Sequence, residues 1–381
     1  MVMPSPHTAS PAARRLVASP VFALMHAADG ACFVMQEAEP YAQYWLTERE
    51  RLVFALFGRK GGAGVRGVVD ALLILRAPRD AEAERGRIER AIAGMRGAGV
   101  LTEPDGELSR YGAAMARDYL EHRPFPRALA GRIIARAGIG EESRVLDLAS
   151  GPGSLALQLA QACPNVSIME LSRGFCAAAQ AEAAARGLRI TAINESCNRL
   201  AQHEGSYHAI TISQALHWLD QAQVCQGVSR NLAPGGRFFV IDAAISLPDA
   251  HPLSYILGDR TPLGDKSAVP FAVQAAERFR RLGQLFAGLG TVVGGVELGL
   301  YRQVRPIDEG FARAFLSRTH LAGLGTDAAA FWQDLALRCA SAAPGAGMGV
   351  LEWSVMEFRE GAPQDDLAGI SAAPAQEIAF P

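Results

Sequence analysis

Residues 144–157 read RVLDLASGPGSLAL, a short apolar run followed by a glycine-containing turn and an apolar helical pattern. The apolar run is typical of a buried strand in a parallel sheet. Gly151 and Gly153 lack a Cβ atom, so the backbone can turn tightly and a ligand can lie against it. A strand, a turn and a helix in this order place a ligand at a helix N-terminus, beyond the carboxyl end of the strand. The stretch therefore predicts a site for a small-molecule cofactor.

Strand and helix patterns alternate outward from this stretch as far as Asp242. The candidate strands are 144–148, 166–170, 189–193, 208–213 and 236–241. Because a helical pattern separates each pair, we expect an α/β fold with a doubly wound, parallel sheet. Further along, Val296–Val304 and Val350–Phe358 read as strands that would add an antiparallel edge.

Residues 13–112 are predicted to form a separate helical module. Its first helix, Thr47–Phe57, opens with Thr47 as the N-cap and Glu50 three residues later, a capping box. Two more helical patterns and a hairpin around Pro-Asp-Gly at 104–106 complete a winged-helix-like domain, suited to dimerisation or to covering the site. The expected organisation is a disordered tail at 1–12, this module at 13–112, a helical connector at 113–137, and a catalytic domain at 138–381 with an inserted segment at 243–295.

Composition narrows the class of protein. The chain has 381 residues, of which 49% are hydrophobic and 20% charged, and a net charge of -2, so no partnership with nucleic acid or an anionic membrane is expected. None of the six cysteines forms a CxxC pair, so no metal site is predicted, and scattered cysteines fit a reducing, cytoplasmic compartment. Arg14 and Arg15 precede an apolar stretch that loosely resembles a secretion signal, but Pro20 interrupts it.

Carboxylates end the first two candidate strands. Asp147 precedes the turn, where an acidic group suits an ammonium group or a hydroxyl better than a pyrophosphate; the alternative is a carboxylate that braces the loop. Glu170 ends the second strand, where it can accept hydrogen bonds from both hydroxyls of a ribose. Ser196 and Cys197 follow the third strand, either near an adenine edge or in ordinary loop packing.

The segment 213–219 follows the fourth strand and should face the reactive end of a cofactor. His217 in this segment is a candidate general base, or a structural histidine beside Trp218. His251 is the second candidate base. The segment 243–295 carries Phe271, Phe279 and Phe286, which either close over a ligand as a lid or pack in the core.

Four segments together resemble the class I S-adenosylmethionine-dependent methyltransferases: VLDLASGPG (145–153), IMEL (168–171), ITISQALHWL (210–219) and LAPGGRFFVID (232–242). The resemblance implies a Rossmann-like methyltransferase fold with a mostly parallel, seven-stranded sheet, and S-adenosylmethionine as the cofactor. The cofactor-binding residues it implies are Asp147, Ala149, Ser150, Gly151 and Gly153 at the methionine part, Glu170 and Leu171 at the ribose, Ser196 and Cys197 near adenine, Ser213 and Gln214 near the sulfonium, and Tyr119 and Arg123 as a cover.

Methyl transfer to a small-molecule acceptor, in secondary metabolism or cofactor biosynthesis, is the activity that this resemblance implies, with a homodimer formed through the N-terminal module. The alternative is a non-catalytic, methyltransferase-like regulator that binds DNA through the winged helix. The arginines at 85, 87, 90 and 96 are consistent with DNA binding. A third interpretation, an NAD-dependent oxidoreductase, is weakened because no third glycine follows Gly153.

Overall fold

The structure is a computed structural model that describes residues 15–18, 22–26, 32–36, 43–58, 63–98, 100–102, 115–248, 251, 270–311, 328–341, 347–362 and 375–379. The chain divides into two units, Met1–Leu108 and Ser109–Pro381. The predicted tail at 1–12 lies outside the described residues, as does most of the predicted hairpin at 99–111.

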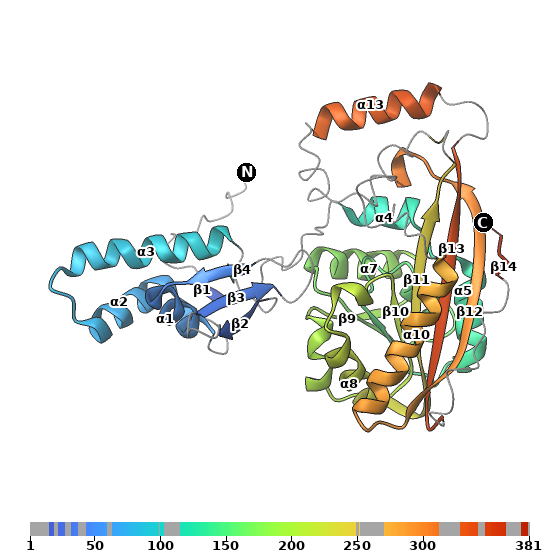
Figure 1. The fold of residues 1–381 in the computed structure, drawn as a ribbon, viewed down its shortest axis with the longest axis horizontal. Helices are drawn as coiled ribbons and strands as arrows, with labels where there is room; N and C mark the ends of the chain where they lie inside the picture. The colour runs from blue at the N-terminus through green and yellow to red at the C-terminus, as the bar shows by residue number, and fades with distance from the viewer. Residues whose placement is uncertain are drawn as a thin grey trace, which may run out of the picture. The chain divides into compact units, whose positions relative to one another are not determined.

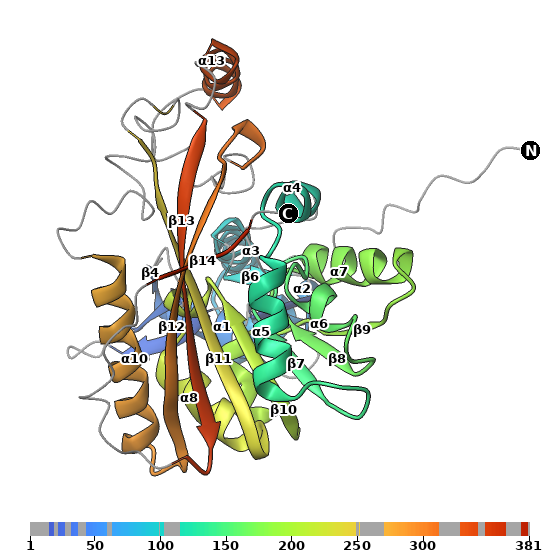
Figure 2. The same ribbon diagram turned by 90° about the vertical axis from the view of Figure 1, so that its right-hand side faces the viewer.

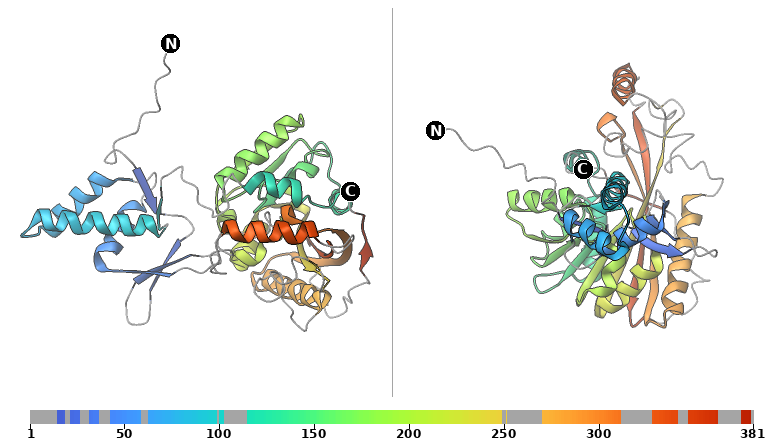
Figure 3. Two further views of the ribbon diagram at one scale, coloured as in Figure 1. Left: turned by 90° about the horizontal axis from the view of Figure 1, so that it is seen from above. Right: turned by 90° about the vertical axis from the view of Figure 1, so that its left-hand side faces the viewer.

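The first unit contains the three helices that the sequence predicts (Figures 1 and 3). They are α1 (Glu48–Phe57), α2 (Val65–Arg76) and α3 (Ala81–Gly97). The capping box is confirmed: the Thr47 side chain accepts a hydrogen bond from the backbone of Glu50, and the Glu50 side chain accepts one from the backbone of Thr47. Apolar faces of the three helices meet in one core, at residues that include Phe57, Leu72 and Met95.

Two small antiparallel sheets accompany these helices, and the helical patterns did not predict them. One has the order β5-β1-β6 and the other β2-β3-β4. Their strands are β1 (Arg15–Ala18), β2 (Phe22–His26), β3 (Cys32–Gln36), β4 (Gln43–Leu46), β5 (Ala63–Gly64) and β6 (Leu101–Thr102). The stretch from Leu16 to Met25, which loosely resembled a secretion signal, therefore lies largely in strands β1 and β2.

A mixed sheet of eight strands forms the second unit, in the order β14-β12-β13-β11-β10-β7-β8-β9. Five strands run parallel, as predicted: β7 (Val145–Leu148), β8 (Val166–Met169), β9 (Ile190–Ile193), β10 (Tyr207–Ser213) and β11 (Leu232–Ser246). The antiparallel edge is confirmed, because β13 (Met348–Glu360) runs opposite to both β11 and β12 (Val293–Pro306). The expected number of seven strands was wrong by one: β14 (Gln376–Glu377), only two residues long, adds an eighth.

Helices cover both faces of this sheet (Figure 2). One face packs against α5 (Arg127–Ala137), α6 (Ala156–Leu159) and α7 (Arg173–Ala185), and the other against α8 (Gln221–Asn231) and α10 (Phe271–Gly288). The alternation of buried side chains along β7 sends Val145 to the first face and Leu146 to the second. Two further helices are described, α4 (Ala116–His122) and α13 (Ala328–Ser341).

Helix α10 settles one of the open alternatives. Phe279 and Phe286 are fully buried and contact the ring of Phe358 on β13, with ring centroids 5.0 and 5.5 Å away. These two side chains are core residues of the sheet and not a lid. In the part of the chain that the structure describes, no helix is long and apolar enough to cross a membrane.

The order of the parallel strands creates a switch point. From β7 the chain moves to one side through β8 and β9, and it then returns to the other side of β7 for β10 and β11. In open α/β sheets, ligands bind outside the carboxyl ends of the strands at such a point. The fold therefore directs attention to the residues that follow β7 and β10.

Candidate functional site

Two non-glycine residues at the switch point adopt left-handed backbone conformations. Ala149, which follows β7, has a φ of 47°, and Gln214, which follows β10, has a φ of 53°. Within the described part of the second unit, they are the non-glycine residues with positive φ. The Ala149 amide donates to the carbonyl of Met169 at 2.8 Å, and the Gln214 amide donates to the carbonyl of Ile241 at 2.7 Å. Neighbouring strands thus hold both turns in conformations of the kind that concentrates at functional sites.

Glu170 lies beside the glycine turn. Its carboxylate is 7% exposed and accepts hydrogen bonds from the backbone amides of Gly151 and Ser172, each at 2.8 Å. The backbone fixes the orientation of the carboxylate, as recognition of two vicinal hydroxyls requires.

The turn itself needs its glycines. Gly151 has a φ of 59° and Gly153 a φ of 92°, both in the region that favours glycine. A Cβ atom on Gly153 would also lie 3.1 Å from the Cβ of Ala179 on α7. The glycine therefore allows α7 to approach the turn closely.

Asp147 is buried inside the sheet rather than exposed on the turn. It is 1% exposed, and its carboxylate accepts a hydrogen bond from the Thr211 hydroxyl of β10 at 2.6 Å. The pKa of Asp147 is raised to about 7, because burial, the largest cause, and the charge of Glu170 outweigh the hydroxyls of Thr211 and Ser150, which lower it. A cationic group placed beside this carboxylate would favour its ionised form.

The residues that follow β9 make contacts that support the turn. The Cys197 sulfur accepts a hydrogen bond from the Ala149 amide at 3.2 Å and donates to the Met169 carbonyl at 3.4 Å. Burial raises the pKa of this thiol, so it stays protonated. The Ser196 hydroxyl accepts from the amide of Asn198. Both residues lie at the predicted edge of the site, and their contact with adenine stays a prediction.

Asn194 is a site residue that the motifs did not single out. Its side-chain amide donates to the carbonyls of Glu170 and Leu171, at 3.0 and 2.9 Å. It thereby ties the end of β9 to the end of β8 and supports the backbone on either side of the Glu170 carboxylate. Its position directly after β9, the third candidate strand, could have indicated that it lies at the edge of the site.

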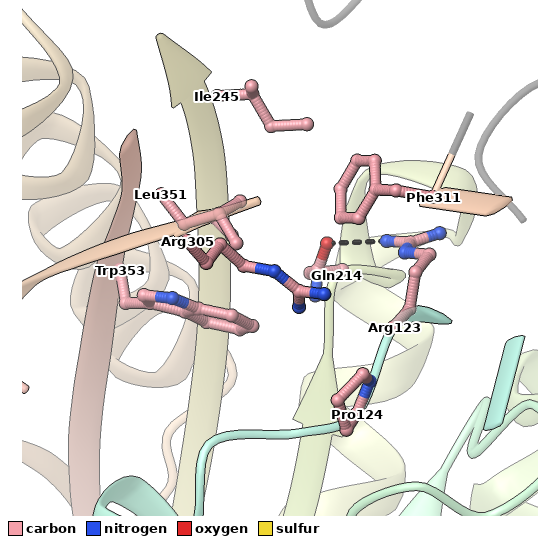
Figure 4. A pocket seen from close by; sticks show the side chains of 9 residues that line it. Arg123, Pro124, Gln214, Ile245, Arg305, Phe311, Leu351 and Trp353 are labelled. Atoms are coloured by element: carbon pink, nitrogen blue, oxygen red, sulfur yellow. Dashed lines mark hydrogen bonds between the residues drawn. The ribbon is translucent and has the colours of Figure 1, made fainter. Parts of the chain in front are cut away.

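The connector reaches the same edge of the sheet. The guanidinium of Arg123 donates to the side-chain oxygen of Gln214 at 2.8 Å, a bond visible in Figure 4. Arg123 also lies over the ring of Tyr119, 4.8 Å from its centroid, and that ring is 5.5 Å from the ring of Phe175 on α7. The structure thus brings both connector residues together with Gln214; their role in covering a cofactor stays a prediction.

A pocket of about 310 Å³, partly open to solvent, adjoins Gln214 and Arg123 (Figure 4). Its other walls come from β11, β12, β13 and Phe311, where β11 runs past the end of β10 and pairs with β13 as far as Ser246. Arg305, Phe311, Leu351 and Trp353 line it and are each less than 9% exposed. The sequence patterns missed these four residues because they lie far along the chain in segments that carry no motif.

The two candidate histidines lie apart from this pocket. His217 is exposed, in the short helix η4 (Leu216–Trp218). His251 is 2% exposed, and burial lowers its pKa, while hydrogen bonds with the backbone at Gly347 and Ile307 raise it. Neither residue lines the pocket.

Part of the second unit is similar to known methyltransferases. Residues 145–236 match the family model described as a methyltransferase domain. The chain is 32% identical over 102 residues to demethylmenaquinone methyltransferase from Thermus thermophilus, a match that covers 26% of this chain and 46% of that protein. It is 31% identical over 120 residues to ubiquinone biosynthesis O-methyltransferase from Cronobacter sakazakii, covering 31% and 49%. The chain spans about half the length of these curated relatives.

Solved structures include similar chains. One is an S-adenosylmethionine-dependent methyltransferase from Thiobacillus denitrificans in complex with S-adenosyl-L-homocysteine, with a TM-score of 0.41 and 19% identity, covering 62% of this chain and 92% of that one. The family model and the curated relatives thus agree that residues 145–236 are similar to a methyltransferase domain.

Proposed function

We propose that the protein transfers a methyl group from S-adenosylmethionine to a small-molecule acceptor. The observation that carries this proposal is the Glu170 carboxylate, oriented by the amides of Gly151 and Ser172 at the carboxyl end of β8. A carboxylate oriented in this way at the end of the second parallel strand suits the two hydroxyls of a ribose. The match of residues 145–236 to a methyltransferase domain supports the same donor.

The residues of the turn fit the amino-acid part of the donor. Ala149 has only a methyl side chain at its strained position, and Gly151 has none, so their backbone can lie directly against a ligand. Asp147, buried at the base of the turn, would compensate an ammonium group. S-adenosylmethionine has no pyrophosphate group, so the turn does not have to bind one. This favours S-adenosylmethionine over a dinucleotide.

Besides binding the donor, the protein has to position the acceptor. S-adenosylmethionine supplies an activated methyl group on its sulfonium when bound. The chain has to align an acceptor atom with that methyl group and exclude water. The pocket beside Gln214 offers a largely apolar place for the acceptor, and a base is needed only for an acceptor that is protonated at rest. Neither His217 nor His251, the two bases that the sequence predicted, lines this pocket.

The first unit is better suited to association than to DNA binding. Arg85 pairs with Asp70 at 3.1 Å, and Arg87 pairs with Glu84 at 3.0 Å, so the charge of these arginines is partly neutralised. Ile74 and Leu75 at the end of α2 are 82% and 67% exposed. Exposed apolar side chains of this kind support the proposed homodimer. Light scattering on the full chain tests it: a dimer that Ile74→Glu with Leu75→Glu converts to a monomer agrees, whereas a wild-type monomer contradicts it.

Calorimetric titration with S-adenosylmethionine tests the main proposal. We expect one molecule to bind per chain, and Glu170→Ala to abolish or strongly weaken that binding. A well-folded wild-type protein that binds no S-adenosylmethionine would overturn the proposal.

A further inference from the structure

The pocket beside Gln214 has an unusual set of walls for an apolar cavity. Of the nine described residues that line it, two are arginines, Arg123 and Arg305, and none is acidic. Apart from Gln214, the others are apolar or aromatic. Two guanidinium groups in the walls favour a ligand that carries a negative charge.

Arg305 is held in place by the backbone. It is 6% exposed, and its guanidinium donates to the carbonyls of His122 and Pro306 at 3.0 and 3.3 Å. It also lies 5.3 Å from the centre of the Phe311 ring. Burial lowers the pKa of Arg305 to about 10, and the charge of Asp308 raises it, so the group is cationic at neutral pH. Its direction is therefore fixed before any ligand arrives.

Trp353 adds a neutral donor to the same wall. Its side chain is 4% exposed, and its indole nitrogen makes no hydrogen bond with any described residue. A buried indole N–H normally has an acceptor. In Figure 4 the guanidinium of Arg305 lies between the indole ring of Trp353 and Gln214. Arg305, a fixed cation, and Trp353, whose indole N–H has no acceptor among the described residues, therefore both line this pocket.

We propose that this pocket selects an acceptor with a planar, apolar body and one carboxylate, which Arg305 and the indole N–H of Trp353 bind. This inference rests on the proposed methyl transfer and names the class of acceptor. The apolar walls at Phe311 and Leu351 would hold the body of the acceptor. Arg123, bonded to Gln214, stays with the donor.

Matched pairs of substituted benzoates and benzamides are the probes for a test. Binding is measured by calorimetry and by ligand-observed NMR on the full chain saturated with S-adenosylhomocysteine. We expect some benzoates to bind at least about tenfold more tightly than their amides, because an ionised acceptor makes the stronger bond to a guanidinium. If no benzoate binds, or if the amides bind equally well, the inference is wrong.

Three variants assign the preference to residues. Arg305→Met should remove the preference for acids, and Arg305→Lys should restore part of it. Trp353→Phe keeps a ring but loses the N–H, and should weaken benzoate binding severalfold. Arg302→Met is the matched control, because Arg302 is an exposed arginine on the same strand, near Glu377, and its loss should change nothing. Circular dichroism verifies that each variant is folded.

The affinity for S-adenosylhomocysteine separates this inference from the proposed function. If the wild type does not bind S-adenosylhomocysteine, the donor assignment fails. If Arg305→Met loses affinity for S-adenosylhomocysteine and keeps the preference for acids, Arg305 belongs to the donor site and the inference is overturned.

Discussion

The backbone amide of Gly151 donates a hydrogen bond to the carboxylate of Glu170 at 2.8 Å. This bond joins the turn after β7 to the end of β8, 19 positions along the chain. It fixes one carboxylate oxygen, and the amide of Ser172 fixes the other. The donor-binding account depends on this arrangement, because an oriented carboxylate is what distinguishes a ribose site from an ordinary acidic loop residue.

Glu170→Gln should strongly weaken the binding of S-adenosylmethionine. Both carboxylate oxygens accept from backbone N–H groups, one from Gly151 and one from Ser172. The side-chain NH₂ of glutamine is a donor, so it would face one of these N–H donors without a hydrogen bond. We expect a loss of roughly 1.5–3 kcal/mol, about tenfold or more in affinity, by calorimetry. Glu182→Gln on the exposed side of α7 is the control and should bind normally. Normal binding by a folded Glu170→Gln variant would exclude Glu170 from the site.

Gly153→Ala should destabilise the second unit. The new side chain would have to adopt a φ of 92° and would place its Cβ 3.1 Å from that of Ala179. We expect a loss of about 1–3 kcal/mol in the free energy of unfolding, measured by urea denaturation. Gly131→Ala is the matched substitution. Gly131 lies inside α5, and a Cβ atom added there would have nothing within 4 Å, so alanine should raise the free energy of unfolding by about 0.5–1 kcal/mol. Equal effects of the two substitutions would contradict the geometry of the turn.

Asp147 should make stability depend on pH. Its pKa is about 7 in the folded protein, against 3.8 for an unperturbed group, so between these values the folded state binds more protons than the unfolded state. The contribution of Asp147 to stability is therefore full at low pH and is lost as the pH rises toward and through 7. Asp147→Asn removes the titrating group but keeps an acceptor for Thr211, so its unfolding free energy should fall less between pH 5 and pH 8. Urea denaturation at several pH values measures this difference, and parallel curves would refute the raised pKa.

The histidines should matter little to the chemistry, because neither lines the pocket. Once an acceptor is known, His217→Asn should change the rate of methyl transfer by less than about twofold. General-base catalysis contributes about 100-fold or more, so a drop of that size would make His217 the base after all. His251→Asn should reduce stability, because His251 is buried and hydrogen-bonded with the backbone, while leaving the rate per folded molecule unchanged.

The parallel half of the sheet was predictable because each of its strands carries its own apolar run. The placement of Asp147, Glu170 and Gln214 at one edge of the sheet followed from the same pattern, since the carboxyl ends of neighbouring parallel strands share one edge. The short strands β2, β3 and β4 were missed because their hydrogen-bonding partners, and not a local pattern, define them.

Arg305 and Trp353 could not be predicted as site residues. They lie on adjacent antiparallel strands, β12 and β13, and reach the pocket only because these strands run past the end of β10. Nothing in their local sequence marks them, whereas Arg123 was implied by the family resemblance, from its place in the stretch before β7. Recognition of the acceptor depends on such long-range placement, and recognition of the donor depends on short motifs.

A crystal structure of the full chain with S-adenosylhomocysteine would test the central claim most directly. The account predicts the ribose hydroxyls on the two oxygens of Glu170, the amino-acid part against the turn from Ala149 to Gly153, and the sulfur facing Gln214 and the adjoining pocket. A bound ligand whose ribose lies away from Glu170, or a site that stays empty at saturating ligand, would contradict it.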